Sequence, residues 1–149
     1  MIRSAEASVR MVNEELIEAR IREMNDAMGL LKRITSTGFE DLSIYERLSL
    51  RYLVIQLVEA ASGICLHVLM DAYNERAEGY PECFIRLGEK GFMPEGLARR
   101  LALAARLRNL LVHRYWTIDD RKVYESVRRG LRDFEDFLRY VRDFLKKRG

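Results

Sequence analysis

The apolar residues near the C-terminus constrain the fold more than any other feature of the sequence. They follow alternating steps of four and three residues: Val123, Val127, Leu131, Phe134, Leu138, Val141 and Leu145. This spacing places them on one stripe of an α-helix, and such a stripe is buried against neighbouring helices in a bundle. The 149 residues include only two prolines and nine glycines, fewer turn residues than a sheet protein usually needs. The sequence therefore predicts an all-α protein.

Two more long helices are predicted in the first half of the chain. Apolar residues recur at helical intervals from about Met11 to Ile34, and Ser36-Thr-Gly38 ends the pattern. Ser43-Ile-Tyr-Glu46 has the spacing of a capping box, in which the serine oxygen and the glutamate carboxylate each accept a hydrogen bond from the other residue's backbone amide. A second helix should start there and run to about Tyr73.

Turn residues divide the rest of the chain. Gly79-Tyr-Pro81 marks a turn before a short helix from Cys83 to Lys90, Pro94 suits the first turn of a fourth helix, and Asp119 or Asp120 should cap the last. The apolar residues expected on the inner face of the fourth helix are Leu97, Leu101, Leu103, Ala104, Leu107, Leu110 and Leu111. We expect one domain over residues 1–149, an up-and-down bundle of four long helices plus a short extra helix.

Polar residues interrupt the most apolar stretch, Leu53–Met70. Because the polar groups at positions 56, 59, 62 and 67 would be costly in a bilayer, a buried helix fits better than a membrane span. At about 100° per residue, one stripe of this helix carries a polar seam: Gln56, Glu59, Gly63, His67 and Asp71. The seam can face water, or it can line a cleft or a subunit interface. A lone histidine such as His67 is more often structural than catalytic.

Neither the N-terminus nor the cysteines point to export, a metal or a cofactor. Met-Ile-Arg-Ser-Ala-Glu lacks the apolar core of a secretory signal, so we expect a cytoplasmic protein. Cys65 and Cys83 are too far apart in sequence for a Cys-x-x-Cys site and have no histidines at zinc spacing, so we expect reduced, inert thiols. We therefore predict no resident metal or cofactor.

Positive charge is concentrated in the C-terminal third. Residues 1–98 contain 11 basic and 16 acidic residues and residues 99–149 contain 15 and 7, giving net charges of −5 and +8. Such a surface favours an anionic partner, with nucleic acid as the default candidate, although a solvated helix face has the same composition. The cations expected to contact RNA are Arg106, Arg114, Arg121 and Lys122.

One short motif brings most of the reactive side chains together: Arg108-Asn-Leu-Leu-Val-His113-Arg-Tyr115. Asn109 and His113 are four residues apart and share a helix face, whereas Arg108 and His113 are five apart, about 140° around an ideal helix. Arginine and histidine therefore converge poorly within one chain. A two-fold axis beside the helix would gather two of each around one cleft, which predicts a homodimer.

The motif suits metal-free cleavage of RNA. A histidine can remove the proton from a ribose 2′-hydroxyl, which attacks the adjacent phosphorus while arginine stabilises the charge on the phosphoryl oxygens. Mg²⁺-dependent cleavage is disfavoured because no carboxylates cluster at the motif. A structural interpretation stays open, with Arg108 and Arg114 on the surface near a helix C-terminus and His113 capping its carbonyl groups.

The motif resembles the Arg-x-x-x-x-His-x-Tyr signature of HepT-like toxins of the HEPN superfamily. The stretch from Arg51 to Ala61, followed by His67, also resembles that family's second helix, and the similarity in order and pattern covers roughly Tyr45 to Lys146. The resemblance implies a dimeric helical bundle with a metal-independent endoribonuclease site at the dimer cleft. Arg108 and His113 would hold the catalytic positions, and Asn109 the polar position beside the arginine.

The resemblance also implies a partner and a regulatory step. In this family the toxin is paired with a small MntA-like nucleotidyltransferase antitoxin, which transfers AMP from ATP to the motif tyrosine, here Tyr115. AMP would add bulk and negative charge where RNA phosphates must lie. Two alternatives remain: a non-catalytic helical partner of a nucleotidyltransferase, and a basic bundle that binds nucleic acid without cleaving it.

Overall fold

The computed structural model describes residues 2–113 and 117–148, with side chains from residue 13 onward. The chain forms α1 (Ile2–Thr35), a short 3₁₀ helix η1 (Phe39–Asp41), α2 (Ile44–Tyr73), α3 (Tyr80–Glu89), α4 (Glu95–His113) and α5 (Asp120–Arg148). No strand occurs within these described ranges. The predicted all-α class, with four long helices and a short extra one, is confirmed.

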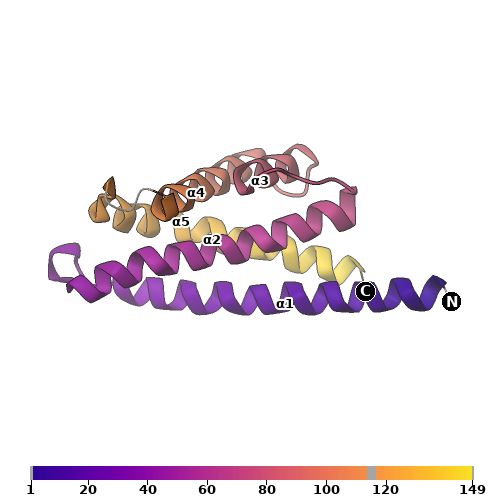
Figure 1. Ribbon diagram of the computed structural model, residues 1–149, viewed down its shortest axis with the longest axis horizontal. Helices are drawn as coiled ribbons and strands as arrows, with labels where there is room; N and C mark the ends of the chain where they lie inside the picture. Colours follow the sequence, from indigo (N-terminus) through magenta and orange to yellow (C-terminus); the bar gives the residue numbers. More distant parts are fainter. Residues whose placement is uncertain (1, 114–116, 149) are drawn as a thin grey trace.

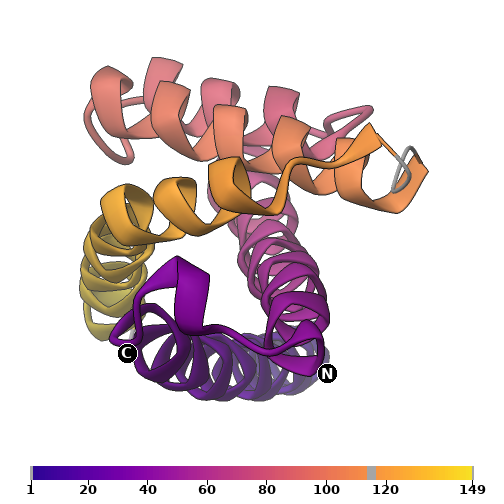
Figure 2. The ribbon, with the colours of Figure 1, turned by 90° about the vertical axis from the view of Figure 1, so that its left-hand side faces the viewer.

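The long helices enclose a common core. Figure 1 shows α1 and α2 as an extended antiparallel pair, with α3 and α4 lying together above them. In the end-on view of Figure 2, α1, α2 and α5 form three sides of the bundle, and the pair of α3 and α4 covers the fourth. Helix α4 therefore has one face toward α2 and α3 and another toward α5.

Local signals account for where several helices begin. The Ser43 side chain accepts from the Glu46 amide and the Glu46 carboxylate accepts from the Ser43 amide, as the capping-box spacing predicted. Asp119 Oδ1 accepts from the Arg121 amide at 3.0 Å, which confirms the cap of the last helix. Helix α3 begins at Tyr80, three residues earlier than predicted, because Pro81 fits the first helical turn.

The buried residues confirm the apolar stripe that the sequence predicted for the last helix. Six of the seven α5 residues are buried, and Leu145 is partly buried. Helix α2 is long and apolar enough to cross a membrane by length and composition, yet 61% of its most apolar window is buried inside the bundle. It is the central helix of the core, as predicted for Leu53–Met70.

Two inner-face predictions for α4 are wrong. Leu103 and Leu110 are 59% and 43% exposed, whereas Leu97, Leu101 and Leu111 are buried. At about 100° per residue, Leu103 and Leu110 share an outward stripe with Arg106. Leucines occur on nearly every side of this helix, so apolarity alone did not distinguish the core face from the outer face.

Candidate active site

Arg108 and His113 lie on different sides of α4. The Arg108 side chain points inward to the junction of α2, α3 and α4 and is only 19% exposed. His113 is the last residue of α4 and is exposed. The orientation of Arg108 rules out a freely solvated surface arginine, and the exposed His113 does not contribute to the junction that holds the guanidinium.

Three groups surround the Arg108 guanidinium. Nη1 donates to Asn109 Oδ1 at 2.9 Å, and Nη2 donates to Glu59 Oε1 at 2.6 Å. The guanidinium carbon lies 5.1 Å from the centre of the Tyr80 ring, within the range of a cation–π contact. Arg108 Nε is buried and has no hydrogen-bond partner within the described chain. Asn109 thus accepts a hydrogen bond from the guanidinium of the arginine that precedes it.

The polar seam of α2 divides between two environments. Glu59 faces the motif, so at this position the seam lines the junction beside α4. Asp71, three turns along, binds Asn13 of α1 and Arg148 of α5 instead. Gln56 and His67 are partly buried. Neither Glu59 nor Tyr80 was predicted at the site from the sequence. Helical periodicity placed Glu59 on the polar seam, and this was the signal that pointed toward it.

The predicted RNA-binding cations differ in their surroundings. Arg106 and Lys122 are exposed. Arg121 is already engaged, because it pairs with Glu40 and its guanidinium carbon lies 4.6 Å from the centre of the Phe39 ring. Arg114 and Tyr115 lie outside the described residues. Arg106 and Lys122 are therefore the described cations of this set that are available to an anion.

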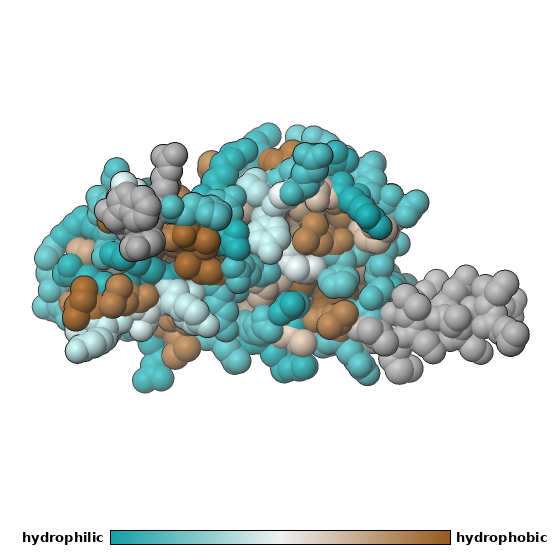
Figure 3. All heavy atoms as spheres, viewed as in Figure 1, coloured by the Kyte–Doolittle hydropathy of each residue, from teal (hydrophilic) through white to brown (hydrophobic). Residues whose placement is uncertain are grey.

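Apolar side chains are exposed at the end of the molecule where the motif lies. Tyr45, Leu48 and Tyr52 of α2 are 77%, 48% and 65% exposed, and Leu110 and Val112 of α4 are also exposed. Figure 3 shows hydrophobic surface on this side of the molecule. We call these five residues the apolar surface. Exposed apolar patches of this kind mark contact sites between proteins.

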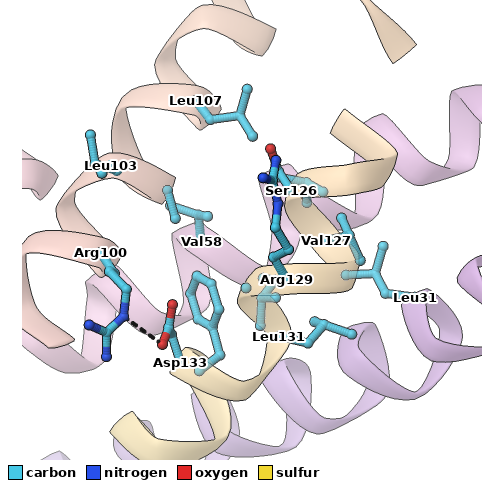
Figure 4. A pocket seen from close by; sticks show the side chains of 15 residues that line it. Leu31, Val58, Arg100, Leu103, Leu107, Ser126, Val127, Arg129, Leu131 and Asp133 are labelled. Carbon is cyan, nitrogen blue, oxygen red and sulfur yellow. Dashed lines mark hydrogen bonds and ion pairs between the residues drawn. The ribbon is translucent and has the colours of Figure 1, made fainter. Parts of the chain in front are cut away.

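A hollow lies between α4 and α5. It has a volume of about 340 Å³, and Figure 4 shows apolar side chains such as Leu103, Leu107 and Val127 around it. At its rim Arg100 Nε donates to Asp133 Oδ1 at 3.0 Å. This groove contains neither His113 nor Arg108. The residues that the structure describes also include no group of three histidine, cysteine or acidic side chains placed to hold a metal ion.

The fold and motif agree with the comparison to known proteins. A family model described as ribonuclease HepT-like matches residues 12–141. The chain belongs to this HepT-like family. It is 28% identical over 132 residues to the tRNA nuclease HepT of Aphanizomenon flos-aquae (strain 2012/KM1/D3), covering 87% of this chain and 90% of that protein. The family predicted from the motif is thus confirmed.

Solved structures share the HepT-like fold at low sequence identity. A toxin–antitoxin complex with AMP-PNP gives a TM-score of 0.80 at 18% identity, covering 87% of this chain and 98% of that chain. The tri-AMPylated Shewanella oneidensis HEPN toxin in complex with MNT antitoxin gives 0.79 at 19%, covering 86% and 97%. YutE, a cytosolic Bacillus subtilis protein of unknown function, gives 0.79 at 17%, covering 91% and 92%.

Proposed function

We propose that this HepT-like chain is the metal-independent endoribonuclease toxin of a toxin–antitoxin pair. The main support for the proposal is the position of the motif arginine in a chain of this family. Arg108 is turned inward and held by polar contacts at the end of α4. A curated relative named as a tRNA nuclease supports RNA as the substrate. The family match over residues 12–141 supports one domain over residues 1–149, and the similar fold of the cytosolic protein YutE supports a cytoplasmic enzyme.

In the proposed reaction, His113 takes the proton of a ribose 2′-hydroxyl, which attacks the neighbouring phosphorus as the 5′-oxygen leaves. Arg108 stabilises the negative charge that gathers on the phosphoryl oxygens, and Asn109 supports the guanidinium. A second imidazole, needed to protonate the leaving oxygen, comes from the other subunit. The exposed Arg106 and Lys122, together with Arg114, hold the RNA backbone, whereas Arg121 stays paired with Glu40.

The proposed active form is a homodimer. Within one chain Arg108 points inward and His113 outward, so one chain alone assembles only part of a site. The apolar surface adjoins the motif and gives a second copy an area to bury. A two-fold axis there brings the His113 of one subunit toward the Arg108 of the other.

The proposed partner is an MntA-like nucleotidyltransferase that inactivates the toxin by adding AMP to Tyr115. Support comes from the similar fold of a tri-AMPylated HEPN toxin bound to an MNT antitoxin. The added phosphate is an anion close in sequence to Arg108 and His113 and would repel RNA phosphates. Incubation with an MntA-like nucleotidyltransferase and ATP should add the mass of AMP to wild type but not to Tyr115→Phe.

The experiment for the reaction itself is an RNA cleavage assay in EDTA. Wild type should cut RNA and leave 2′,3′-cyclic phosphate ends, and Arg108→Ala and His113→Ala should both abolish cutting without unfolding the chain. A protein that binds the nucleotidyltransferase but leaves a broad RNA panel intact would instead be a non-catalytic partner. Salt-dependent RNA binding without cutting, unchanged in His113→Ala, would identify a nucleic-acid-binding bundle.

A further inference from the structure

The environment of Arg108 comes mostly from outside the motif. Of the three groups around its guanidinium, only Asn109 is a motif residue; Glu59 belongs to α2 and Tyr80 begins α3. Glu59 is 49 residues from Arg108 in sequence, so this contact depends on the packing of α2 against α4. Nothing in the motif itself specifies either contact.

These contacts restrict the guanidinium in complementary ways. Arginine is a long, flexible side chain that loses substantial rotamer entropy when it is held in one place. Asn109 and Glu59 accept from two different nitrogens, which restricts rotation of the guanidinium plane, and the Tyr80 ring supports one face of that plane. The buried Nε shows that the stem of Arg108 already lies inside the junction.

We propose that Glu59 and Tyr80 are positioning residues for Arg108: they hold its guanidinium in the orientation that meets the phosphate during cleavage. This inference rests on the proposed ribonuclease function. Neither residue exchanges a proton with the RNA. Both act through Arg108, and a catalytic group displaced by about 1 Å can slow a reaction by as much as a hundredfold.

Because Glu59 is negatively charged, its effect on RNA binding can be distinguished from its effect on the orientation of Arg108. The Glu59 side chain is 45% exposed, so an approaching phosphate meets a carboxylate beside the arginine. Removing that charge should strengthen RNA binding, whereas removing the acceptor should release the guanidinium. Glu59→Gln removes the charge and keeps an oxygen acceptor, while Glu59→Ala removes both. The two substitutions therefore have different expected effects on KM and kcat.

Steady-state cleavage by the full-length protein tests this difference. Glu59→Ala should lower kcat on the order of tenfold to a hundredfold, with KM unchanged or reduced. Glu59→Gln should recover most of kcat and lower KM. Tyr80→Phe should keep wild-type kcat because the ring remains, whereas Tyr80→Leu should lower it. The matched control is Glu23, which pairs with Arg20 at 3.0 Å on the surface of α1, where Ala or Gln should change neither constant.

A measurement that does not depend on catalysis distinguishes the positioning role of Glu59 and Tyr80 from the ribonuclease proposal. In ¹H–¹⁵N spectra the Arg108 guanidinium should give a resolved, slowly exchanging signal in wild type and Glu59→Gln, but not in Glu59→Ala. Thermal unfolding confirms that each variant is folded. Wild type that cuts no RNA would overturn the ribonuclease proposal alone. Glu59→Ala with an ordered Arg108 signal or wild-type kcat, or Glu59→Gln as slow as Glu59→Ala, would overturn the positioning role.

Discussion

The two ends of the motif are built differently. Around Arg108, three helices converge and supply an amide, a carboxylate and an aromatic ring to one guanidinium. His113, five residues later, is exposed at the end of α4. Each chain thus organises the charge-stabilising half of the proposed site and presents the proton-transferring half outward. This difference supports the proposal that two subunits share the site, with the apolar surface as their contact.

The largest expected effect is on RNA cleavage, and protein stability then distinguishes Arg108 from His113. Arg108→Ala and His113→Ala should each reduce RNA cleavage by at least about 1,000-fold, because each removes a whole catalytic function. Only Arg108→Ala should also lower the free energy of unfolding, by about 1–2 kcal/mol, since its stem and its partners lose their contacts. Cleavage assays and urea unfolding measure both quantities. Equal stability loss in His113→Ala would show that His113 is held by the fold as firmly as Arg108.

The next effect concerns the apolar surface, which we propose joins two copies of the chain. Tyr52→Glu places a charge in the apolar surface and should convert the dimer to a monomer in light scattering, with loss of cleavage. The matched control is Leu30→Glu, which puts the same charge on an exposed apolar position of α1. The control should stay dimeric and active. A monomeric Tyr52→Glu protein with full activity would show that one chain completes the site.

A smaller effect concerns the ion pair that holds the start of α5 against α2. Arg51 of α2 binds the first residue of α5, Asp120, through two hydrogen bonds of 2.5 and 2.8 Å, and both side chains are largely buried. Asp120→Ala leaves the Arg51 charge unpaired and should lower the unfolding free energy by about 2–3 kcal/mol in urea titrations. No loss would mean that packing of α5, rather than this pair, holds the start of the helix.

The smallest effect is a pH dependence of the stability that Glu75 contributes in the connection between α2 and α3. The hydrogen bond from Lys90 Nζ, at 2.9 Å, lowers the pKa of Glu75 below its usual value. A carboxyl with a lower pKa in the folded state stabilises the fold above its unfolded-state pKa, and that stability is lost as the pH falls through the folded value. Glu75→Gln should therefore melt earlier than wild type at pH 7, and the difference in melting temperature should shrink as the pH falls through the folded-state pKa of Glu75.

The sequence determined the helices better than their orientations. The capping box at Ser43, the cap at Asp119 and the α5 stripe are local signals, and each appears in the structure where it was predicted. The motif was recognised because its spacing is local too. By contrast, the outward positions of Leu103 and Leu110 depend on which side of α4 faces its neighbours, and leucine is compatible with either side.

The contacts of Arg108 could not be predicted for the same reason. Helical periodicity placed Glu59 on a polar seam but did not say whether water or α4 faced it, and Tyr80 was assigned to a turn. Both contacts arise from the packing of α2 and α3 against α4. Tertiary contacts between distant segments leave no periodic signal in a single sequence.

The most direct test of the central claim mixes two inactive proteins. Arg108→Ala and His113→Ala homodimers are mixed, denatured together and refolded, so that heterodimers form alongside the parents. Each heterodimer then holds one intact arginine and one intact histidine on different chains. If the site is shared between subunits, the heterodimer has one arginine and one catalytic base but lacks the second imidazole, so RNA cleavage should rise well above that of either parent and stay below the wild-type rate. If the mixture contains heterodimers and stays as inactive as either parent, the shared site is contradicted.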